Sequence, residues 1–299
     1  MSDSHKDKAG QASSTVDPGQ APLRALPTAA FVGYRPFPPV MNLYVNYTFL
    51  LSALKSYKLC GATETDFLYL VEYHLGYTPR GPLNFGRGIY LRNGPSFADP
   101  ILTAVGEEFP IPLLVSLFSP DTVVKLPPRD LGKNPRDMVD EVLSAGRSKG
   151  REVAFKFAVE VGVKRICRES FEWRKCPTGV LVAAGGKPEG GGGHTTKSWY
   201  TLHRLAPSRP PGPPPASASA AKDSEAEDDG ETLAVLTFNR VFSLTHQFTL
   251  ELKGAGRTGE LGDRWALMVV TTALGLLYLR SSGKTGKATV GAAQAIHGK

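Results

Sequence analysis

The sequence of 299 residues predicts a mainly β fold, an antiparallel barrel or sandwich of about nine to twelve short strands, with one buried helix near its end. In many short segments apolar residues alternate with polar ones, which is the pattern of a strand with one buried face. The 32 glycines and 24 prolines favour short elements joined by turns over a bundle of helices. One late segment, residues 265–279, contains no charged residue at all.

Three segments predict disorder and thereby delimit the folded domain. Residues 1–30 form a proline-containing amino arm, and residues 281–299 form a basic tail. Residues 207–230 begin with a proline cluster and end with an acidic run, and they contain almost no large apolar side chain whose burial could offset the entropy of ordering. We therefore expect one folded domain over residues 31–280, interrupted by a disordered insertion at 207–230.

The predicted strands follow one another along most of the domain. In residues 152–162, Val153, Phe155 and Phe157 alternate with polar or small residues, and turn signals rich in Gly, Pro, Asn and Asp separate nearly all of the segments. The other predicted strands are 42–49, 67–75, 87–94, 99–108, 122–128, 171–175, 198–205, 232–238 and 247–254.

Helices are few in this pattern. Asn134 followed by Pro135 is a good cap and first-turn pair, and Val139, Val142 and Leu143 then share one helical face as far as Gly146, which predicts a short surface helix. The segment 49–58 is ambiguous between helix and strand. Strands and helices do not alternate regularly, so a doubly wound nucleotide-binding fold is disfavoured.

The C-terminal helix is predicted from residues 265–279, with Asp263 capping its start and Gly283 ending it. It is apolar on every side, so it must be buried all round, either in protein or in lipid. Fifteen residues span roughly 22 Å, which is short of a hydrocarbon core of about 30 Å, so burial in protein is favoured. A tail-anchored membrane protein that spans the bilayer with 265–279 is the alternative. The residues expected to form the core of this helix are Trp265, Leu267, Met268, Val270, Leu274 and Leu277.

No catalytic, metal-binding or cofactor-binding constellation is recognisable in the sequence. The histidines lack the spacing of zinc ligands, no Gly-x-Ser-x-Gly motif occurs, and the glycine run 185–193 is not followed by the helix that a dinucleotide fingerprint needs. We expect a non-enzymatic protein without a cofactor. An enzyme whose site is assembled from dispersed residues is the alternative.

Cysteine usage and the amino end indicate a reducing compartment. Cys60, Cys167 and Cys176 are too few, and odd in number, for a disulfide framework, and the first residues lack the apolar core of a secretory signal. We expect a cytoplasmic monomer that contacts membranes only peripherally.

The basic residues suggest what the domain binds. The net charge is +7, and the insertion 207–230 alone carries −3, so the rest of the chain carries about +10. Basic residues that flank the later strands could meet on one rim of a barrel and attract anionic phospholipid headgroups. The alternative interpretation is that they are ordinary solubilising strand ends. The charge is too diffuse, and lacks the aromatic-basic motifs, for nucleic-acid binding. The candidate lipid-binding residues are Lys164, Arg165, Arg168, Arg174, Lys175, Arg204, Lys253 and Arg257.

Three phrases accompany the series of strands and the final apolar helix: FEWRK, SWYTLHRL and FTLELKGAGRTGELGDRWALMVV. In this element order and these phrases, residues from about 31 to 280 resemble the tubby C-terminal-like superfamily, which includes tubby proteins, phospholipid scramblases and LURP-one-related proteins. The phrases FEWRK, GIYLRNGP, VVKLPP and GDRWALMVVTTALGLLYL are also similar to those of uncharacterised filamentous-fungal proteins with this fold.

This resemblance implies an antiparallel closed barrel of about nine to twelve strands that encloses the C-terminal hydrophobic helix. A closed barrel has no sheet edges and needs its interior filled, and an apolar helix can fill it. The resemblance also implies a binding module for acidic lipids or for a protein partner. No residues match the phosphoinositide site of tubby, and the cysteine cluster and calcium loop of scramblases are missing.

Overall fold

The computed structural model describes residues 33–47, 56–74, 85–108, 119–129, 138–148, 152–163, 165–176, 198–205, 230–239 and 245–297. The amino arm 1–30, the insertion 207–230 except Gly230, and the glycine run 185–193 lie outside these ranges.

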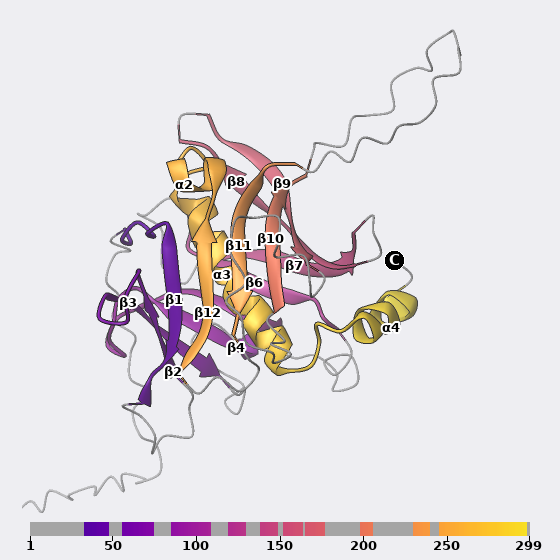
Figure 1. Cartoon of the computed structure of the whole chain (residues 1–299), viewed down its shortest axis with the longest axis horizontal. Helices are drawn as coiled ribbons and strands as arrows, with labels where there is room; N and C mark the ends of the chain where they lie inside the picture. Colours follow the sequence, from indigo (N-terminus) through magenta and orange to yellow (C-terminus); the bar gives the residue numbers. More distant parts are fainter. Residues whose placement is uncertain are drawn as a thin grey trace, which may run out of the picture.

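The described residues form a closed antiparallel barrel of twelve strands (Figure 1). Each strand pairs with the next one along the chain, and β1 also pairs with β12, so the sheet has no outer edge. This confirms the predicted closed barrel of about nine to twelve strands. The strands are β1 Val40–Val45, β2 Ser56–Cys60, β3 Phe67–His74, β4 Phe85–Arg92, β5 Ile101–Glu108, β6 Thr122–Leu126, β7 Val139–Arg147, β8 Val153–Val161, β9 Cys167–Lys175, β10 Ser198–Arg204, β11 Thr232–Phe238 and β12 His246–Leu252.

The interior of the barrel is built from the alternating apolar residues. Phe157 of β8 lies opposite Phe171 of β9 in the pairing register, and their rings stack with centroids 5.5 Å apart. Phe171 in turn meets Trp265 of the C-terminal helix edge-on at 6.1 Å. Aromatic pairs in these geometries contribute about 0.5–1.5 kcal/mol beyond the area that they bury.

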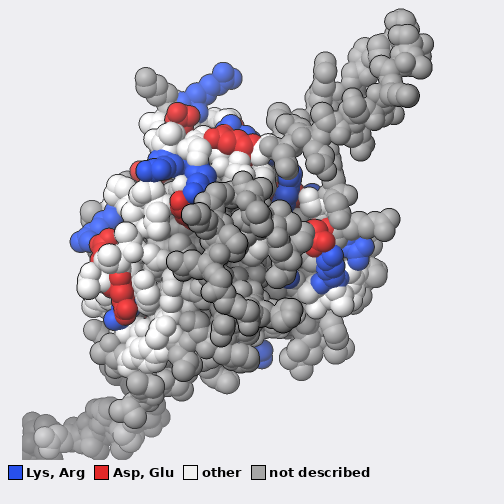
Figure 2. Space-filling view, viewed as in Figure 1, with Lys and Arg blue, Asp and Glu red and all other residues white. Residues whose placement is uncertain are grey.

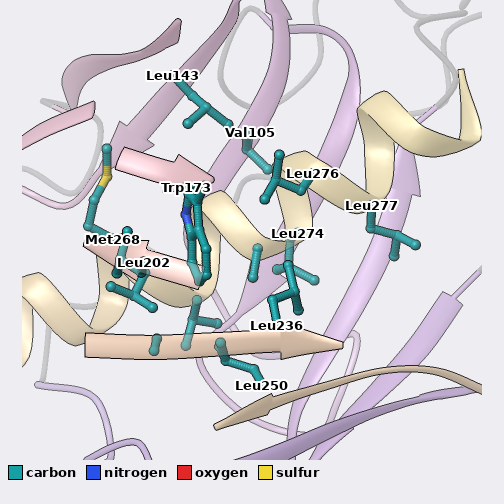
Figure 3. Close-up of a cluster of buried hydrophobic side chains, with 14 of the residues drawn as sticks. Val105, Leu143, Trp173, Leu202, Leu236, Leu250, Met268, Leu274, Leu276 and Leu277 are labelled. Carbon is teal, nitrogen blue, oxygen red and sulfur yellow. The ribbon is translucent and has the colours of Figure 1, made fainter. Parts of the chain in front are cut away.

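The C-terminal helix α3, Asp263–Ser281, runs through this interior (Figures 1 and 3). It packs on strands from different parts of the barrel, and Gly275 lets Val105 and Leu143 approach so closely that a Cβ at this position would lie 2.8 Å and 3.2 Å from their methyl carbons. The prediction of a helix buried on every side is therefore confirmed. All of the predicted core residues of this helix are buried: Trp265, Leu267, Met268, Val270, Leu274 and Leu277.

The two threonine hydroxyls of α3 find hydrogen-bond partners inside the barrel, whereas the buried indole N–H of Trp265 has none among the described residues. The Thr271 hydroxyl donates to the carbonyl of Leu267 at 2.7 Å, four residues back in the same helix. The Thr272 hydroxyl donates to the carbonyl of Val269 at 3.1 Å and accepts a hydrogen bond from the indole N–H of Trp173 at 3.0 Å. Satisfied hydroxyls of this kind avoid the penalty of about 1–3 kcal/mol that an unpaired buried polar group would impose.

The two ends of α3 match the predicted boundaries with one difference. The N-cap is Gly262, which makes no side-chain cap, and Asp263 is the first helical residue instead of the predicted cap. At the other end Gly283 has φ of 70°, its N–H donates to the carbonyl of Arg280, and the N–H of the next residue donates to Leu279. This is the Schellman arrangement, which a glycine at that position permits, so the predicted end is confirmed.

The predicted surface helix is wrong over residues 139–146, and its predicted start at Asn134 and Pro135 lies outside the described residues. The residues that were expected to share its face lie in strand β7, which pairs with β6 through Val139–Leu143 and with β8 through Ser144–Arg147. Hydrogen bonding to two neighbouring strands outweighs the local helix signal, because helix propensities differ by less than about 1 kcal/mol per residue. The ambiguous segment 49–58 contributes the first residues of β2.

The C-terminal tail is also more ordered than predicted. Residues 281–299 were expected to be disordered, but helix α4, Lys287–His297, lies within them. Val290 of α4 is buried, and Lys287 pairs with Glu152 at 2.6 Å. A short helix, α2 Gly254–Thr258, precedes α3. Within the described ranges, no helix combines the length and hydropathy needed to cross a bilayer.

Candidate functional site

The basic residues that the sequence singled out lie at two opposite ends of the barrel. The larger group lies at the end of the barrel where α2 lies (Figure 1). The β8–β9 hairpin is held at this end because the backbone N–H of Gly162 donates to the carbonyl of Leu261, just after α2, at 3.0 Å. Lys164 lies outside the described residues. The group at the α2 end comprises Arg165, Arg168, Arg204, Lys253 and Arg257, whereas Arg174 and Lys175 lie at the other end of β9.

Acidic side chains neutralise much of the group at the α2 end. The Arg168 guanidinium binds Glu141 through two contacts of 2.8 Å and 2.5 Å. Arg204 of β10 pairs with Glu169 of β9 at 2.5 Å. Figure 2 shows the result on one face, where acidic and basic side chains are interleaved. The basic residues at this end thus form a mixed surface with acidic side chains, in which a few cations have no ion-pair partner among the described residues.

Arg165 and Arg257 are the cations of this group without an ion-pair partner in the part of the chain that the structure describes, and both are exposed. Arg165 belongs to the tip of the β8–β9 hairpin, which also carries two exposed apolar side chains. Val163 is 71% exposed and Ile166 is 39% exposed. We define Val163, Arg165 and Ile166 as the hairpin tip.

The two apolar residues of the hairpin tip were not among the candidates predicted from the sequence. The signal was the series Val-Lys-Arg-Ile after Gly162, in which apolar and basic residues occur together in a turn. Gly162 has φ of 99°, and a Cβ on it would lie 2.2 Å from the carbonyl oxygen of Arg165. The tight turn therefore requires glycine here, and the side chains of Val163, Arg165 and Ile166 that follow it are exposed.

An ion-pair network connects the base of the β8–β9 hairpin to the start of α3. The Glu160 carboxylate accepts a hydrogen bond of 2.9 Å from Arg264, at the start of α3, and a longer one of 3.4 Å from Arg168. Burial alone would raise the pKa of Glu160, but the hydrogen bond from Arg264, a backbone hydrogen bond and the charges of Arg264 and Arg168 together lower this pKa below its ordinary value. The carboxylate is thus held ionised where strand β8 meets the central helix.

This lowered pKa predicts a pH-dependent contribution to stability. A carboxyl group with a lower pKa in the folded state stabilises the fold above its ordinary value of 4.5, and the contribution disappears as pH falls through the folded value. We expect Glu160→Gln to reduce the free energy of unfolding at pH 7 by about 1 kcal/mol, with the difference from wild type vanishing in acid. Urea unfolding between pH 3 and pH 7 measures both.

Glu251→Gln is the matched control, because Glu251 pairs with Lys253 at 2.5 Å and both side chains are 43% exposed. Its stability should follow that of wild type at every pH. A constant stability difference between Glu160→Gln and wild type across this range would contradict the role of the Glu160 charge.

A groove of about 370 Å³ lies on the outer face of the barrel where β7 and β8 separate. The charged side chains that line it form ion pairs: Asp140 with Lys125 at 2.8 Å, Glu141 with Arg168, and Lys156 with Glu172 at 3.6 Å. The groove is lined by Asp140, Glu141, Val142, Ser144, Lys156, Phe157, Ala158, Arg168, Ser170 and Leu205. Each charged side chain that lines the groove therefore has an ion-pair partner.

Cys60 and Cys167 are not activated as nucleophiles. Burial raises the pKa of Cys60 to about 11, and the hydrogen bond to Glu169 raises the pKa of the exposed Cys167. Both shifts disfavour the thiolate, which is the reactive form. Among the described residues, no three His, Cys, Asp or Glu side chains converge in a way that could hold a metal ion.

The barrel with a filled interior is compatible with a non-enzymatic module, and its distinctive surface feature is the hairpin tip. Comparison of the chain with protein-family models, with curated proteins and with solved structures finds no match.

Proposed function

We propose that this protein is a non-enzymatic binding module that associates reversibly with acidic membrane surfaces through the hairpin tip. The observation that carries the proposal is the exposure of Val163 and Ile166 on a turn that also presents Arg165. Apolar side chains can enter the region between headgroups and acyl chains, while the neighbouring guanidinium contacts anionic phosphates. The proposed location is the cytoplasm, with peripheral membrane contact by a monomer.

The expected strength of this association is modest. Full burial of one aliphatic side chain contributes about 1.5–3 kcal/mol, and each basic residue near an acidic surface contributes about 1 kcal/mol. Two apolar side chains and a few unpaired cations therefore support binding that is reversible and sensitive to salt. The ion pairs around Arg168 and Arg204 limit the contribution of these two residues, although the sequence analysis had included them.

The proposed relationship to the tubby C-terminal-like superfamily supports the same function. A twelve-stranded antiparallel barrel around a C-terminal helix is the plan that the resemblance implies. If the protein belongs to this superfamily, we expect it to bind a lipid or a protein partner. We offer this membership as a proposal that rests on element order and on the phrases quoted above.

The test is co-sedimentation of the full chain with phosphatidylcholine vesicles that contain phosphatidylserine or a phosphoinositide. We expect the double variant Val163→Ser/Ile166→Ser to bind at least tenfold more weakly than wild type, and Arg165→Ser to bind about fivefold more weakly. Raising the salt concentration should weaken wild-type binding. Binding to pure phosphatidylcholine should be much weaker.

Two matched controls separate the hairpin tip from general surface effects. Val142→Ser removes an apolar side chain that is 52% exposed on β7, and Arg87→Ser removes an exposed arginine at the opposite end of the barrel. Both should bind vesicles like wild type. Absence of vesicle binding by wild type at low salt, or unchanged binding by the double variant, would refute the proposal.

A further inference from the structure

A second basic cluster lies at the end of the barrel opposite the hairpin tip. Arg280, in the last turn of α3, donates to the carbonyl of Asn239 at 3.2 Å and to the Ser198 hydroxyl, and its guanidinium carbon lies 4.8 Å from the ring centroid of Phe238. Lys175, at the end of β9, donates to the carbonyl of Thr285 at 3.5 Å.

Among the described residues, neither Lys175 nor Arg280 forms an ion pair with a carboxylate, although the charge of Glu152 acts on Lys175 from a longer distance. Burial lowers the pKa of Arg280, and burial together with the charge of Arg280 lowers the pKa of Lys175. Lys287 adds a third positive charge, and Glu152, which pairs with Lys287 at 2.6 Å, is the acid beside the group. We call Lys175, Arg280 and Lys287 the cationic cluster. Its positive charges therefore exceed the negative charge next to them.

The segments that follow Cys176 and Asn239 in the sequence contain too few acidic residues to neutralise the cationic cluster. Residues 177–197 and 240–244, which continue from Cys176 and Asn239, lie outside the described ranges. Together they contain one acid, Glu189, and their basic residues outnumber it. An external anion is thus the natural counter-charge for the cationic cluster.

The carbonyl groups at the end of α3 are not free to act as that counter-charge. The N–H groups of Gly283 and Lys284 cap the carbonyls of Arg280 and Leu279 at 3.1 Å and 2.8 Å. The helix end still favours nearby cations, but a helix dipole supplies only about half an elementary charge. Two or three cations exceed what this dipole can balance.

We propose that the cationic cluster and the Ser198 hydroxyl form a binding site for a phosphate monoester group. Arginine presents a planar fork of donors that matches two phosphate oxygens, lysine adds a point charge, and the serine hydroxyl can donate to a third oxygen. Arg280 and Lys175 are partly exposed and Lys287 is largely exposed, so a ligand can reach them from solvent. The site is distinct from the hairpin tip and does not depend on the proposed membrane contact.

The test is a titration of the full chain with inorganic phosphate at constant ionic strength, with chloride as the reference anion. Binding is measured by the NMR chemical shifts of the backbone amides. We expect saturable shifts around Ser198 and Arg280 with phosphate but not with chloride. Lys175→Gln should weaken phosphate binding about tenfold, and Lys175→Arg should retain most of it. Lys253→Gln, which removes a lysine at the α2 end, is the matched control and should bind like wild type.

A parallel arm with phosphatidylcholine vesicles containing phosphatidic acid identifies the source of the phosphate group. Loss of vesicle binding in Lys175→Gln would assign the site to a lipid headgroup, and loss of inorganic-phosphate binding alone would assign it to a soluble ligand. Absence of saturable shifts beyond those with chloride, or unchanged phosphate affinity in Lys175→Gln, would overturn the proposal. Val163→Ser/Ile166→Ser should still bind phosphate, so failure of the membrane proposal leaves this result intact.

Discussion

Val270→Asp is expected to unfold the domain. Val270 lies in the middle of α3, is 0% exposed, and belongs to a core cluster that contains interior residues of every strand. An unpaired carboxylate in such a place loses its hydration without a compensating partner, which destabilises a fold by several kcal/mol even after local relaxation. Because domains of this kind are stable by only about 5–15 kcal/mol, the near-UV circular dichroism of the variant should be lost.

Val270→Thr is the matched control because threonine has nearly the shape of valine. Its hydroxyl can donate to the carbonyl four residues back, as Thr271 does to Leu267 at 2.7 Å. This variant should fold and lose about 1–3 kcal/mol of unfolding free energy. A folded, monomeric Val270→Asp protein with wild-type stability in urea would contradict the buried position of α3.

Trp173→Ala is expected to reduce the free energy of unfolding by about 3–5 kcal/mol. Trp173 of β9 is 0% exposed and is one of the largest side chains that the interior encloses (Figure 3). Truncation leaves a cavity beside α3 and removes the hydrogen bond of 3.0 Å from the indole to the Thr272 hydroxyl. Chemical denaturation of wild type and variant measures the loss.

A double-mutant cycle separates packing from this hydrogen bond. Trp173→Phe keeps most of the aromatic volume, and Thr272 retains its own bond to the Val269 carbonyl at 3.1 Å. We expect Trp173→Phe to lose less stability than Trp173→Ala, and Trp173→Phe combined with Thr272→Val to show a coupling of about 0.5–1.5 kcal/mol. A coupling near zero would mean that the indole contributes only its volume.

The central helix was predictable because its signal is local and strong. A long segment without charge, bounded by Asp263 and Gly283, admits no arrangement in water other than burial on all sides. The strands were predictable for a similar reason, since alternation in a segment such as Val153–Val161 allows one face to be buried. The closed form of the sheet agrees with both patterns, because an apolar helix fills a barrel that would otherwise be empty.

Strand β7 shows where local signals fail. Asn134, Pro135 and the spacing of Val139, Val142 and Leu143 satisfy the rules for a helix, but the pairing of this segment with β6 and β8 lies outside the local window. Helix α4 is a converse case. The composition of residues 281–299 predicts disorder, but α4 forms there and its Lys287 pairs with Glu152, a residue distant in sequence.

The sequence by itself determined a barrel-like β domain with a helix buried near its end, because periodicity and the absence of charge dictate which surfaces must avoid water. Only the tertiary structure decided which basic residues are neutralised and which remain free. Arg168 meets Glu141 across strands, whereas Arg165 projects with Val163 and Ile166 from a hairpin that Gly162 shapes. The physical reason is that an ion pair or an exposed patch depends on distances between residues remote in sequence, and no pattern along the chain records these distances.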